Sequence, residues 1–244
     1  MIIAGAKHVV KVSKHFITIL LPTRKRTQIV QKSVAGLLDL ASDAKRIHIA
    51  VAYDHDDEES ANYFSSHGWR NLVEPTGASQ SVHEIDRLGW MDLHEYYNQL
   101  ANKVKSDWYF IWNDDAFMKS FGWDQEIHNQ GNTKHMLSME SNGKLPDSTL
   151  FPCVSKLWVD TFGMIGYNPV DQWIQDITYQ LDAYKRITST IFHDHYKNTG
   201  NNDDETYRST STQKKFTKRA YKTAEMQSIK QDWIAIWKDV LNEN

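Results

Sequence analysis

The sequence has only one cysteine, Cys153, among its 244 residues. A disulfide within the chain is therefore excluded, and a reducing compartment is expected. Positive charge is not in excess either, because 28 Lys and Arg stand against 31 Asp and Glu, for a net charge of −3. Such a balance gives no broad basic surface, so we expect no nucleic-acid partner.

Long hydrophobic runs are also missing near the start of the chain. The longest one there, FITILLP, is too short to cross a bilayer and leads into Arg24, Lys25 and Arg26. No small-residue cleavage site follows it. We therefore expect no membrane span and no signal peptide, and we expect a cytoplasmic protein.

Aromatic residues, in contrast, are abundant, with nine Trp and eleven Tyr. Their side chains fill cores, and their faces also stack on sugars and nucleobases. The 40% of hydrophobic and 24% of charged residues are ordinary for a soluble globular protein. The length suits one sizeable α/β domain. Since no repeat or linker divides the sequence, we expect a single domain over residues 1–244.

Strand and helix patterns alternate over the first 115 residues. A helix is expected over 57–66, with Gly68 after it as the C-terminal stop signal. Asp92 and Glu95 have the spacing of a capping box. This alternation predicts a mainly parallel sheet with helices on both faces. The predicted strands span 15–22, 46–54, 69–75 and 107–113, and the predicted helices span 27–44, 57–66 and 92–104.

The second half is less regular. Residues 198–213 carry many turn formers and no periodicity, so we expect a loop there. An amphipathic helix over about 214–241 ends the chain, with an inner face of Ile229, Trp233, Ile236, Trp237 and Val240. Between 135 and 196 we predict strands over 135–141 and 186–196 and helices over 152–163 and 169–184.

Three predicted strands end in polar or charged residues, and ligands of open α/β sheets bind beyond such ends. Neighbouring carboxylates repel each other and are costly to bury, and a divalent cation such as Mg²⁺ or Mn²⁺ removes both costs. The alternative is that the paired acids cap a helix over 116–121. Because three predicted strands have such ends, we favour a ligand site over a helix cap. The three strand ends are Pro22-Thr23-Arg24, Asp54 and Asn113-Asp114-Asp115.

The segment NQLANKVKSDWYFIWNDDAFMKSFGWD resembles the central part of the family 2 glycosyltransferases, which have the GT-A fold and use nucleotide sugars. In that family a helix with an Asn near its middle leads into a strand that ends in a D-x-D-type motif. ITILLPTRKR is similar to the family's first strand and donor-binding turn, and AVAYDHDDEE to its second strand. A GWD after the motif is similar to bacterial and phage-encoded members.

The resemblance covers about residues 16–125, and it is looser over FPCVSKLWVDTFG…DQWIQDI and HDH. It implies a Rossmann-like GT-A domain with a nucleotide-sugar-binding half over 15–125. A smaller acceptor half over 126–197 and a loop with a C-terminal helix over 198–244 would complete the chain.

The resemblance also implies roles for individual residues. Asp115 matches the final acid of the motif, which binds the metal, whereas Asn113 stands where the family has an acid. Asp54 would accept a hydrogen bond from the nucleobase; the alternative is a solvated acid at a strand end. Arg24 or Arg26 would oppose phosphate charge. The implied donor-binding residues are Pro22, Thr23, Arg24, Asp54, Asn113 and Asp114.

His193 and His195 lie two apart in a strand-like run, so their side chains are expected on one face. Many GT-A enzymes add a late His to the metal, and the resemblance implies that one of these two has that role. The alternative is a pair of core or exposed histidines without a metal.

Sugar transfer with inversion needs a carboxylate that takes the proton of the acceptor hydroxyl. The resemblance places that base at the start of a helix in the second half, where Asp171 fits. A helix N-terminus would keep its pKa low. Simple N-capping by Asp171 is the alternative, and Asp176 is the fallback base.

We therefore expect a hexosyltransferase-type glycosyltransferase that needs Mn²⁺ or Mg²⁺, a nucleoside-diphosphate sugar, and a carbohydrate or other hydroxyl acceptor. Two alternatives stay open. A sugar-1-phosphate nucleotidyltransferase would have a Gly-rich first turn, and LPTRKRTQ contains no Gly. A non-catalytic carbohydrate- or nucleotide-binding module could have the same fold without the base.

Overall fold

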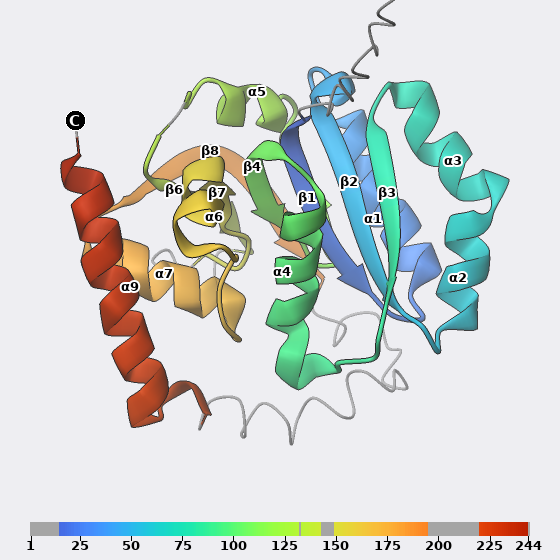
Figure 1. Cartoon of the computed structure of the whole chain (residues 1–244). Helices are drawn as coiled ribbons and strands as arrows, with labels where there is room; N and C mark the ends of the chain where they lie inside the picture. Colours follow the sequence, from blue (N-terminus) through green and yellow to red (C-terminus); the bar gives the residue numbers. More distant parts are fainter. Residues whose placement is uncertain (1–14, 132, 143–148, 195–219, 244) are drawn as a thin grey trace, which may run out of the picture.

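The computed structural model describes residues 15–131, 133–142, 149–194 and 220–243 (Figure 1). Its centre is one eight-stranded sheet with the order β3-β2-β1-β4-β7-β6-β8-β5. The loop predicted over 198–213 lies outside the described residues, as does His195. Among the residues that are described, no helix combines the length and hydropathy that a membrane crossing requires.

The first half of the chain forms the parallel part of the sheet. β1 (His15–Thr23) pairs in parallel with both β2 (Ile47–Asp54) and β4 (Ser106–Ile111), and β2 pairs in parallel with β3 (Ser79–Ile85). These strands therefore end at the same edge of the sheet. The connecting helices are α1 (Thr27–Asp39), α2 (Glu58–Ser65), α3 (His67–Val73) and α4 (Leu93–Lys103).

The second half adds four strands of mixed direction. β7 (Cys153–Ser155) is antiparallel to β4 and to β6 (Met136–Ser141), and β5 (Ala116–Met118) is antiparallel to β8 (Tyr184–His193). β6 and β8 are parallel. The predicted mainly parallel α/β sheet is thus confirmed in outline, and every antiparallel pair among the described strands includes β5 or β7. Its helices are α5 (Trp123–His128), α6 (Lys156–Phe162), α7 (Val170–Gln180) and α9 (Ala224–Asn242).

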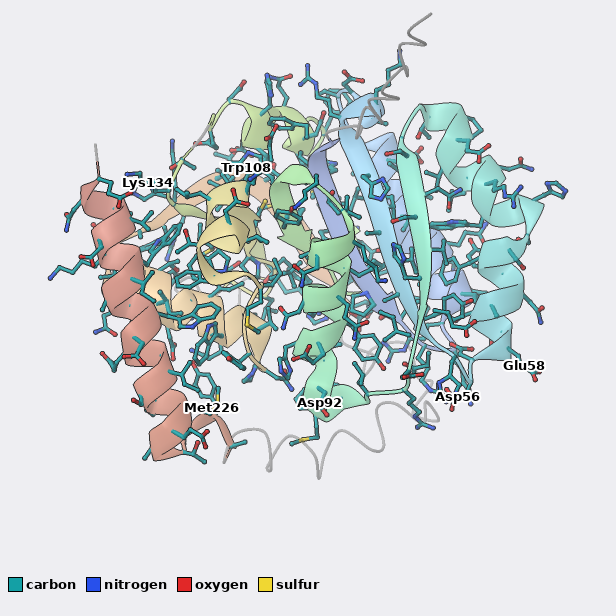
Figure 2. The ribbon with its side chains drawn as sticks, viewed as in Figure 1. Asp56, Glu58, Asp92, Trp108, Lys134 and Met226 are labelled. Atoms are coloured by element: carbon teal, nitrogen blue, oxygen red, sulfur yellow. The ribbon has the colours of Figure 1, made fainter. Side chains whose placement is uncertain are left out.

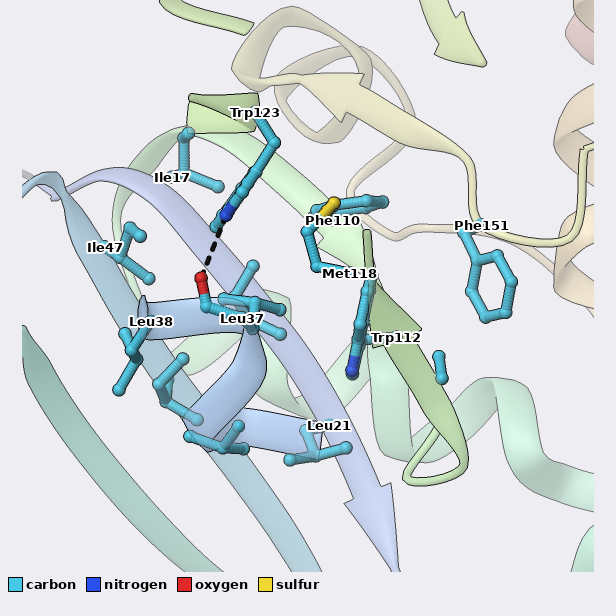
Figure 3. Packing of buried hydrophobic residues seen from close by; sticks show 14 of the residues in the cluster. Ile17, Leu21, Leu37, Leu38, Ile47, Phe110, Trp112, Met118, Trp123 and Phe151 are labelled. Atoms are coloured by element: carbon cyan, nitrogen blue, oxygen red, sulfur yellow. Dashed lines mark hydrogen bonds between the residues drawn. The ribbon is translucent and has the colours of Figure 1, made fainter. Parts of the chain in front are cut away.

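Both faces of the sheet are buried, because successive strand residues point to opposite sides. On one face Ile17, Ile19 and Leu21 pack with side chains of α1, α2, α3 and α5. Figure 3 shows this cluster, in which Trp123 Nε1 donates to the Leu37 carbonyl at 2.9 Å. On the other face Leu20 packs with α4, α6, α7 and α9. In Figure 1, α4 lies in front of the sheet and α1 behind it.

Aromatic side chains attach the C-terminal helix to the second face. Phe162 and Trp233 stack with their ring centroids 3.9 Å apart and their planes 2° from parallel. Trp237 is 1% exposed and packs edge-on against Trp158. The predicted inner face of this helix is confirmed except at Ile236, which is 45% exposed. Ile234 is buried in its place, because the helix is rotated slightly from the predicted orientation.

Three predictions of local structure are wrong. The helix predicted over 152–163 is only partly formed, because Cys153–Ser155 form β7 and α6 begins at Lys156. Residues 69–75 form α3 and a 3₁₀ turn, η2 (Glu74–Thr76), instead of a strand, and Gly68 lies inside α3. The Ser66 side chain caps α3 by accepting from Trp69 N, which starts a new helix where a stop was expected. The third strand is β3, whose sequence SQSVHEI is too polar to show a buried-strand pattern.

The structure also excludes the alternative in which Asp114 and Asp115 cap a helix. Residues 116–118 form β5, so the helix over 116–121 that the acids would cap does not form. Asp92 precedes α4 after the 3₁₀ turn η3 (Trp90–Asp92), but its side chain makes no cap hydrogen bond. A third 3₁₀ turn, η1 (Ala44–Arg46), leads into β2.

Candidate active site

A cavity of about 400 Å³ opens where β1, β2 and β4 end. Figure 2 shows Asp56 and Asp92 at this end of the molecule. Nine of the ten predicted site residues line the cavity, and the tenth, His195, lies outside the described residues. The nine are Pro22, Thr23, Arg24, Asp54, Asn113, Asp114, Asp115, Asp171 and His193.

The paired acids lie in a tight turn between β4 and β5. Ala116 N donates to the Asn113 carbonyl at 3.1 Å, which closes the turn. Beneath it, the buried Ser33 hydroxyl donates to the Ala116 carbonyl at 2.5 Å and accepts from Trp112 Nε1 at 2.9 Å. The backbone of the turn is therefore held by Ser33 of α1 and by Trp112, which follows β4.

Asp114 is buried and has a partner at each oxygen. Oδ2 accepts from the Thr23 hydroxyl at 2.8 Å, and Oδ1 accepts from Arg26 Nη1 at 2.8 Å. Burial raises the pKa of Asp114, and the charge of Arg26 and the two hydrogen bonds only partly oppose that shift. Arg26, which the sequence suggested only as a possible phosphate partner, is therefore a structural part of the acidic turn.

Asp115 pairs with a histidine from the far half of the chain. Its Oδ1 lies 2.9 Å from His193 Nε2, and its Oδ2 lies 3.8 Å from Arg26 Nη1. Burial alone would raise the pKa of Asp115, but the hydrogen bond and charge of His193 and the charge of Arg26 hold it below its ordinary value. The pairing of β5 with β8 places Ala116 opposite His193, which brings the two residues together.

The Asn142 side chain holds the backbone of His193 through two hydrogen bonds. Asn142 Oδ1 accepts from His193 N at 2.8 Å, and Asn142 Nδ2 donates to the His193 carbonyl at 2.5 Å. The Phe151 ring meets the imidazole edge-on, with centroids 5.2 Å apart. One of the two predicted histidines thus lies at the acidic turn in a defined orientation.

Asp115 and His193 supply one carboxylate and one imidazole, which are donors that Mn²⁺ accepts and Mg²⁺ accepts in part. Within the described ranges, no group of three or more His, Cys, Asp or Glu side chains is placed to hold a metal ion. Asp114 is occupied by Thr23 and Arg26. The residues therefore fit a divalent cation that takes most of its ligands from a phosphate group and water.

Asp54 is 3% exposed, which excludes the alternative of a solvated acid. Arg24 Nη1 donates to its Oδ2 at 2.8 Å, and the Tyr96 hydroxyl donates to its Oδ1. Arg24 also bonds to Asp56, with Nη2 at 3.1 Å from Oδ2. Tyr96 is a site residue that the sequence indicated only as part of a helix face. Its contact with Asp54 joins positions 42 apart and depends on the packing of α4 against β2.

Asp171 lies in the first turn of α7 and lines the cavity. Burial raises its pKa to about 6, although backbone hydrogen bonds at Gln172 and at Asp171 itself oppose the shift. The prediction of a low pKa is therefore wrong, because removal from water outweighs the helix N-terminus. Pro169, not Asp171, is the N-cap residue.

The fallback base, Asp176, lies away from the cavity. Its Oδ2 accepts from Lys230 Nζ at 2.8 Å and from the Tyr221 hydroxyl at 2.5 Å. Its Oδ1 accepts from Gln172 Nε2 at 2.5 Å. Lys230 and Tyr221 join α7 to the C-terminal segment, so Asp176 has a structural role.

Two asparagines attach the loop before Asp171 to α4 and to the η3 turn that precedes α4. The Asn98 side chain accepts from Ile165 N at 2.9 Å and from Gly166 N at 3.2 Å, and it donates to the Gly166 carbonyl at 3.1 Å. Asn168 Nδ2 donates to the carbonyls of Trp90 and Met91 at 3.0 and 2.9 Å. Asn98 is the mid-helix Asn of the family resemblance, and its function in this structure is to shape the wall that carries Asp171.

No family model matches the sequence, and no curated protein does. Solved structures are similar in fold. The mannosyltransferase PcManGT from Pyrobaculum calidifontis, in complex with GDP-Man and Mn²⁺, has a TM-score of 0.56 at 11% identity and matches 74% of this chain. S. aureus TarS 1-349 has a TM-score of 0.54 at 10% identity and matches 72% of this chain, and it is also known in complex with UDP-GlcNAc.

This chain covers 57% of the PcManGT chain and 60% of the TarS 1-349 chain. At identities of 10–11%, the likeness concerns the fold alone. The protein thus has the mixed α/β fold of glycosyltransferases of the GT-A kind, as predicted. Its membership of family 2 stays a prediction.

Proposed function

We propose that this protein is a metal-dependent glycosyltransferase, which moves a sugar from a nucleoside-diphosphate sugar to an acceptor hydroxyl with inversion. The observation that carries the proposal is that one cavity gathers the Asp115–His193 pair, two arginines and an aspartate whose pKa is raised to about 6. The nucleotide sugars and the Mn²⁺ named for the two similar structures support it.

The charge of the cavity supports the need for a cation. Its lining holds two arginines, Arg24 and Arg26, against four aspartates, which leaves a charge of 2 − 4 = −2 when His193 is neutral. A diphosphate brings further negative charge to this place. A divalent cation held by Asp115 and His193 would supply the positive charge that the leaving diphosphate needs.

The proposed chemistry assigns a task to each wall. In this proposal residues 15–125 hold the donor, with Thr23 and Arg24 near the nucleotide and Arg26 near the diphosphate, and residues 126–197 face the acceptor. Asp171 accepts the proton of the acceptor hydroxyl, and the oxygen of that hydroxyl forms a bond to the anomeric carbon of the donor sugar. The bond from that carbon to the diphosphate breaks, and the diphosphate leaves with the electron pair. A base with a pKa near the working pH suits this step.

A non-catalytic binding module on the same fold is the main rival. It would have no need for a half-buried carboxylate with a raised pKa, because such a group costs stability when it is ionised. The position of Asp171 in the cavity wall therefore favours the enzyme. Turnover of a nucleotide sugar separates the two possibilities.

The proposal is tested by titrating nucleoside diphosphates into the protein with and without Mn²⁺. Asp115→Ala is expected to abolish Mn²⁺-dependent binding and to leave the circular dichroism spectrum unchanged. Asp86→Ala, which alters an aspartate with a 96% exposed side chain outside the cavity, is the matched control and is expected to behave as wild type. If Asp115→Ala binds nucleotide and Mn²⁺ as wild type does, the assignment of the acidic turn is wrong.

A further inference from the structure

Apolar side chains surround Asp171 in the cavity. We rest here on the proposed function, in which Asp171 takes the proton of the acceptor hydroxyl. Side chains close to Asp171 then meet the part of the acceptor that carries this hydroxyl. The described residues that line this side of the cavity include five apolar or aromatic ones, which are Trp90, Leu93, Leu150, Pro169 and Val170.

The η3 turn lies against the loop that carries Asp171. Asn168 Nδ2, three residues before Asp171, donates to two backbone carbonyls of η3 at 3.0 and 2.9 Å. Trp90 begins this turn, lines the cavity and is half-buried, so part of its side chain stays accessible. The hydrogen bonds of Asn168 therefore bring an aromatic side chain to the same side of the cavity as the proposed base.

The first turns of α4 face the same place. Burial raises the pKa of Tyr97, and the charge of Asp171 adds to this rise, so the two residues are close. Leu93 lies four residues before Tyr97 and thus on the same helix face, and it is half-buried in the cavity lining. Leu150 lines the cavity from the segment that precedes β7.

Few polar side chains on this side are available to an acceptor. Among the described residues of 126–197, those with a polar side chain in the cavity lining are Asn168, Asp171 and His193. Asn168 Nδ2 is bonded to the η3 carbonyls, and His193 Nε2 lies 2.9 Å from Asp115. An acceptor with many hydroxyls would exchange water for few hydrogen-bonding partners, which is costly. An apolar group would instead leave water and gain contacts.

We propose that the acceptor carries an apolar group, an aromatic ring or an alkyl chain, beside the hydroxyl that receives the sugar. Leu93 is a specificity-determining residue for this group, because its side chain is apolar throughout and lies on the helix face that is directed to Asp171. A sugar without such a group is a poorer acceptor.

The test compares methyl, phenyl and octyl glycosides of glucose, galactose, mannose and N-acetylglucosamine as acceptors. The donor is the nucleotide sugar that wild type hydrolyses with Mn²⁺, and the readout is nucleoside diphosphate release above that hydrolysis. At least one phenyl or octyl glycoside is expected to exceed its methyl partner about tenfold or more in kcat/KM, mainly through KM. Removal of part of a phenyl ring from water is worth about that factor. Comparison of phenyl with octyl shows whether a ring or a chain fits better.

Leu93→Asn keeps the approximate size of the side chain and makes it polar. The preference for the apolar glycoside over its methyl partner is expected to fall several-fold. Leu157→Asn is the matched control, because Leu157 lies in α6, is 37% exposed and is outside the cavity. This control is expected to keep the wild-type preference.

The outcomes separate the inference from the proposed function. An equal loss for methyl and apolar glycosides in Leu93→Asn refutes the role of Leu93, because a merely structural residue would give it. If Leu93→Asn does not fold, the wild-type panel still decides the acceptor class. Hydrolysis of the donor without a gain from any phenyl or octyl glycoside over its methyl partner overturns the inference and leaves the proposed function standing. If wild type hydrolyses no nucleotide sugar, the proposed function fails, and the inference fails with it.

Discussion

Asp171→Asn is expected to make the protein more stable and the enzyme inactive. The substitution keeps the size of the side chain and removes its charge. Burial raises the pKa of Asp171 from 3.8 to about 6. Each pKa unit corresponds to about 1.36 kcal/mol, so the ionised carboxylate lowers the free energy of unfolding by about 3 kcal/mol at pH 7.

The sign of this effect depends on pH. The folded protein binds the Asp171 proton more tightly than the unfolded chain does, because the folded pKa is the higher one. The penalty is absent below about pH 3, grows as pH rises, and is nearly complete at about pH 7. The gain in stability of Asp171→Asn over wild type is therefore expected to be about 3 kcal/mol at pH 7 and about 1 kcal/mol near pH 4.5.

As pH rises and Asp171 loses its proton, stability is expected to fall and activity is expected to rise. With a pKa of about 6, the Asp171 carboxylate is ionised in about nine-tenths of molecules at pH 7 and in about one-tenth at pH 5. The wild-type rate should therefore rise about tenfold between these pH values. Asp171→Asn should lower kcat by about 10²- to 10⁴-fold, the usual contribution of a general base.

Urea unfolding at pH 4.5 and pH 7, with the rate of sugar release at matched pH, measures both effects. Asp176→Asn serves as the control, because this residue pairs with Lys230 and Tyr221 outside the cavity. It is expected to lose stability and to retain the pH dependence of the rate. An Asp171→Asn variant that is less stable than wild type at pH 7, or equally active, would refute the assignment of Asp171 as a base with a raised pKa.

Two further predictions concern charge and packing. Arg26→Met removes the guanidinium that lies 2.8 Å from Asp114 and 3.8 Å from Asp115. Calorimetry is expected to show binding of a nucleoside diphosphate with Mn²⁺ weakened by about tenfold or more. Unchanged affinity would exclude Arg26 from the diphosphate site. Trp237→Ala removes a side chain that is 1% exposed and leaves a cavity in the core. Urea unfolding is expected to show a free energy of unfolding lower by about 3–5 kcal/mol. A loss below about 1 kcal/mol would mean that α9 is not part of the core.

The first half of the fold could be predicted because its central strands are buried on both faces. Runs such as ITILL and IHIAVA contain hardly any residue that could face water, so they identify strands without tertiary information. Parallel strands end at one edge, and this geometry alone brings Thr23, Asp54 and Asp114 to one cavity. β3 escaped prediction because it is an edge strand with polar residues on its half-buried surface.

Properties that depend on three-dimensional neighbours could not be predicted in the same way. Asp171 has a raised pKa because its place in the cavity wall removes it from water, and no sequence pattern reports that burial. The contact of Tyr96 with Asp54 likewise follows from the packing of α4 on the sheet. Arg26 looked like a phosphate ligand, and the structure adds that it is also the counter-charge of the acidic turn.

The central claim is that this cavity transfers sugar and does not merely bind a nucleotide. The most direct measurement is the release of nucleoside diphosphate from a panel of UDP-, dTDP- and GDP-sugars, with Mn²⁺ or with EDTA, for wild type and Asp171→Asn. Slow hydrolysis of at least one nucleotide sugar is expected, dependent on Mn²⁺ and lost in the variant. Tight Mn²⁺-dependent binding without turnover of any sugar in the panel would contradict the claim and identify a binding module.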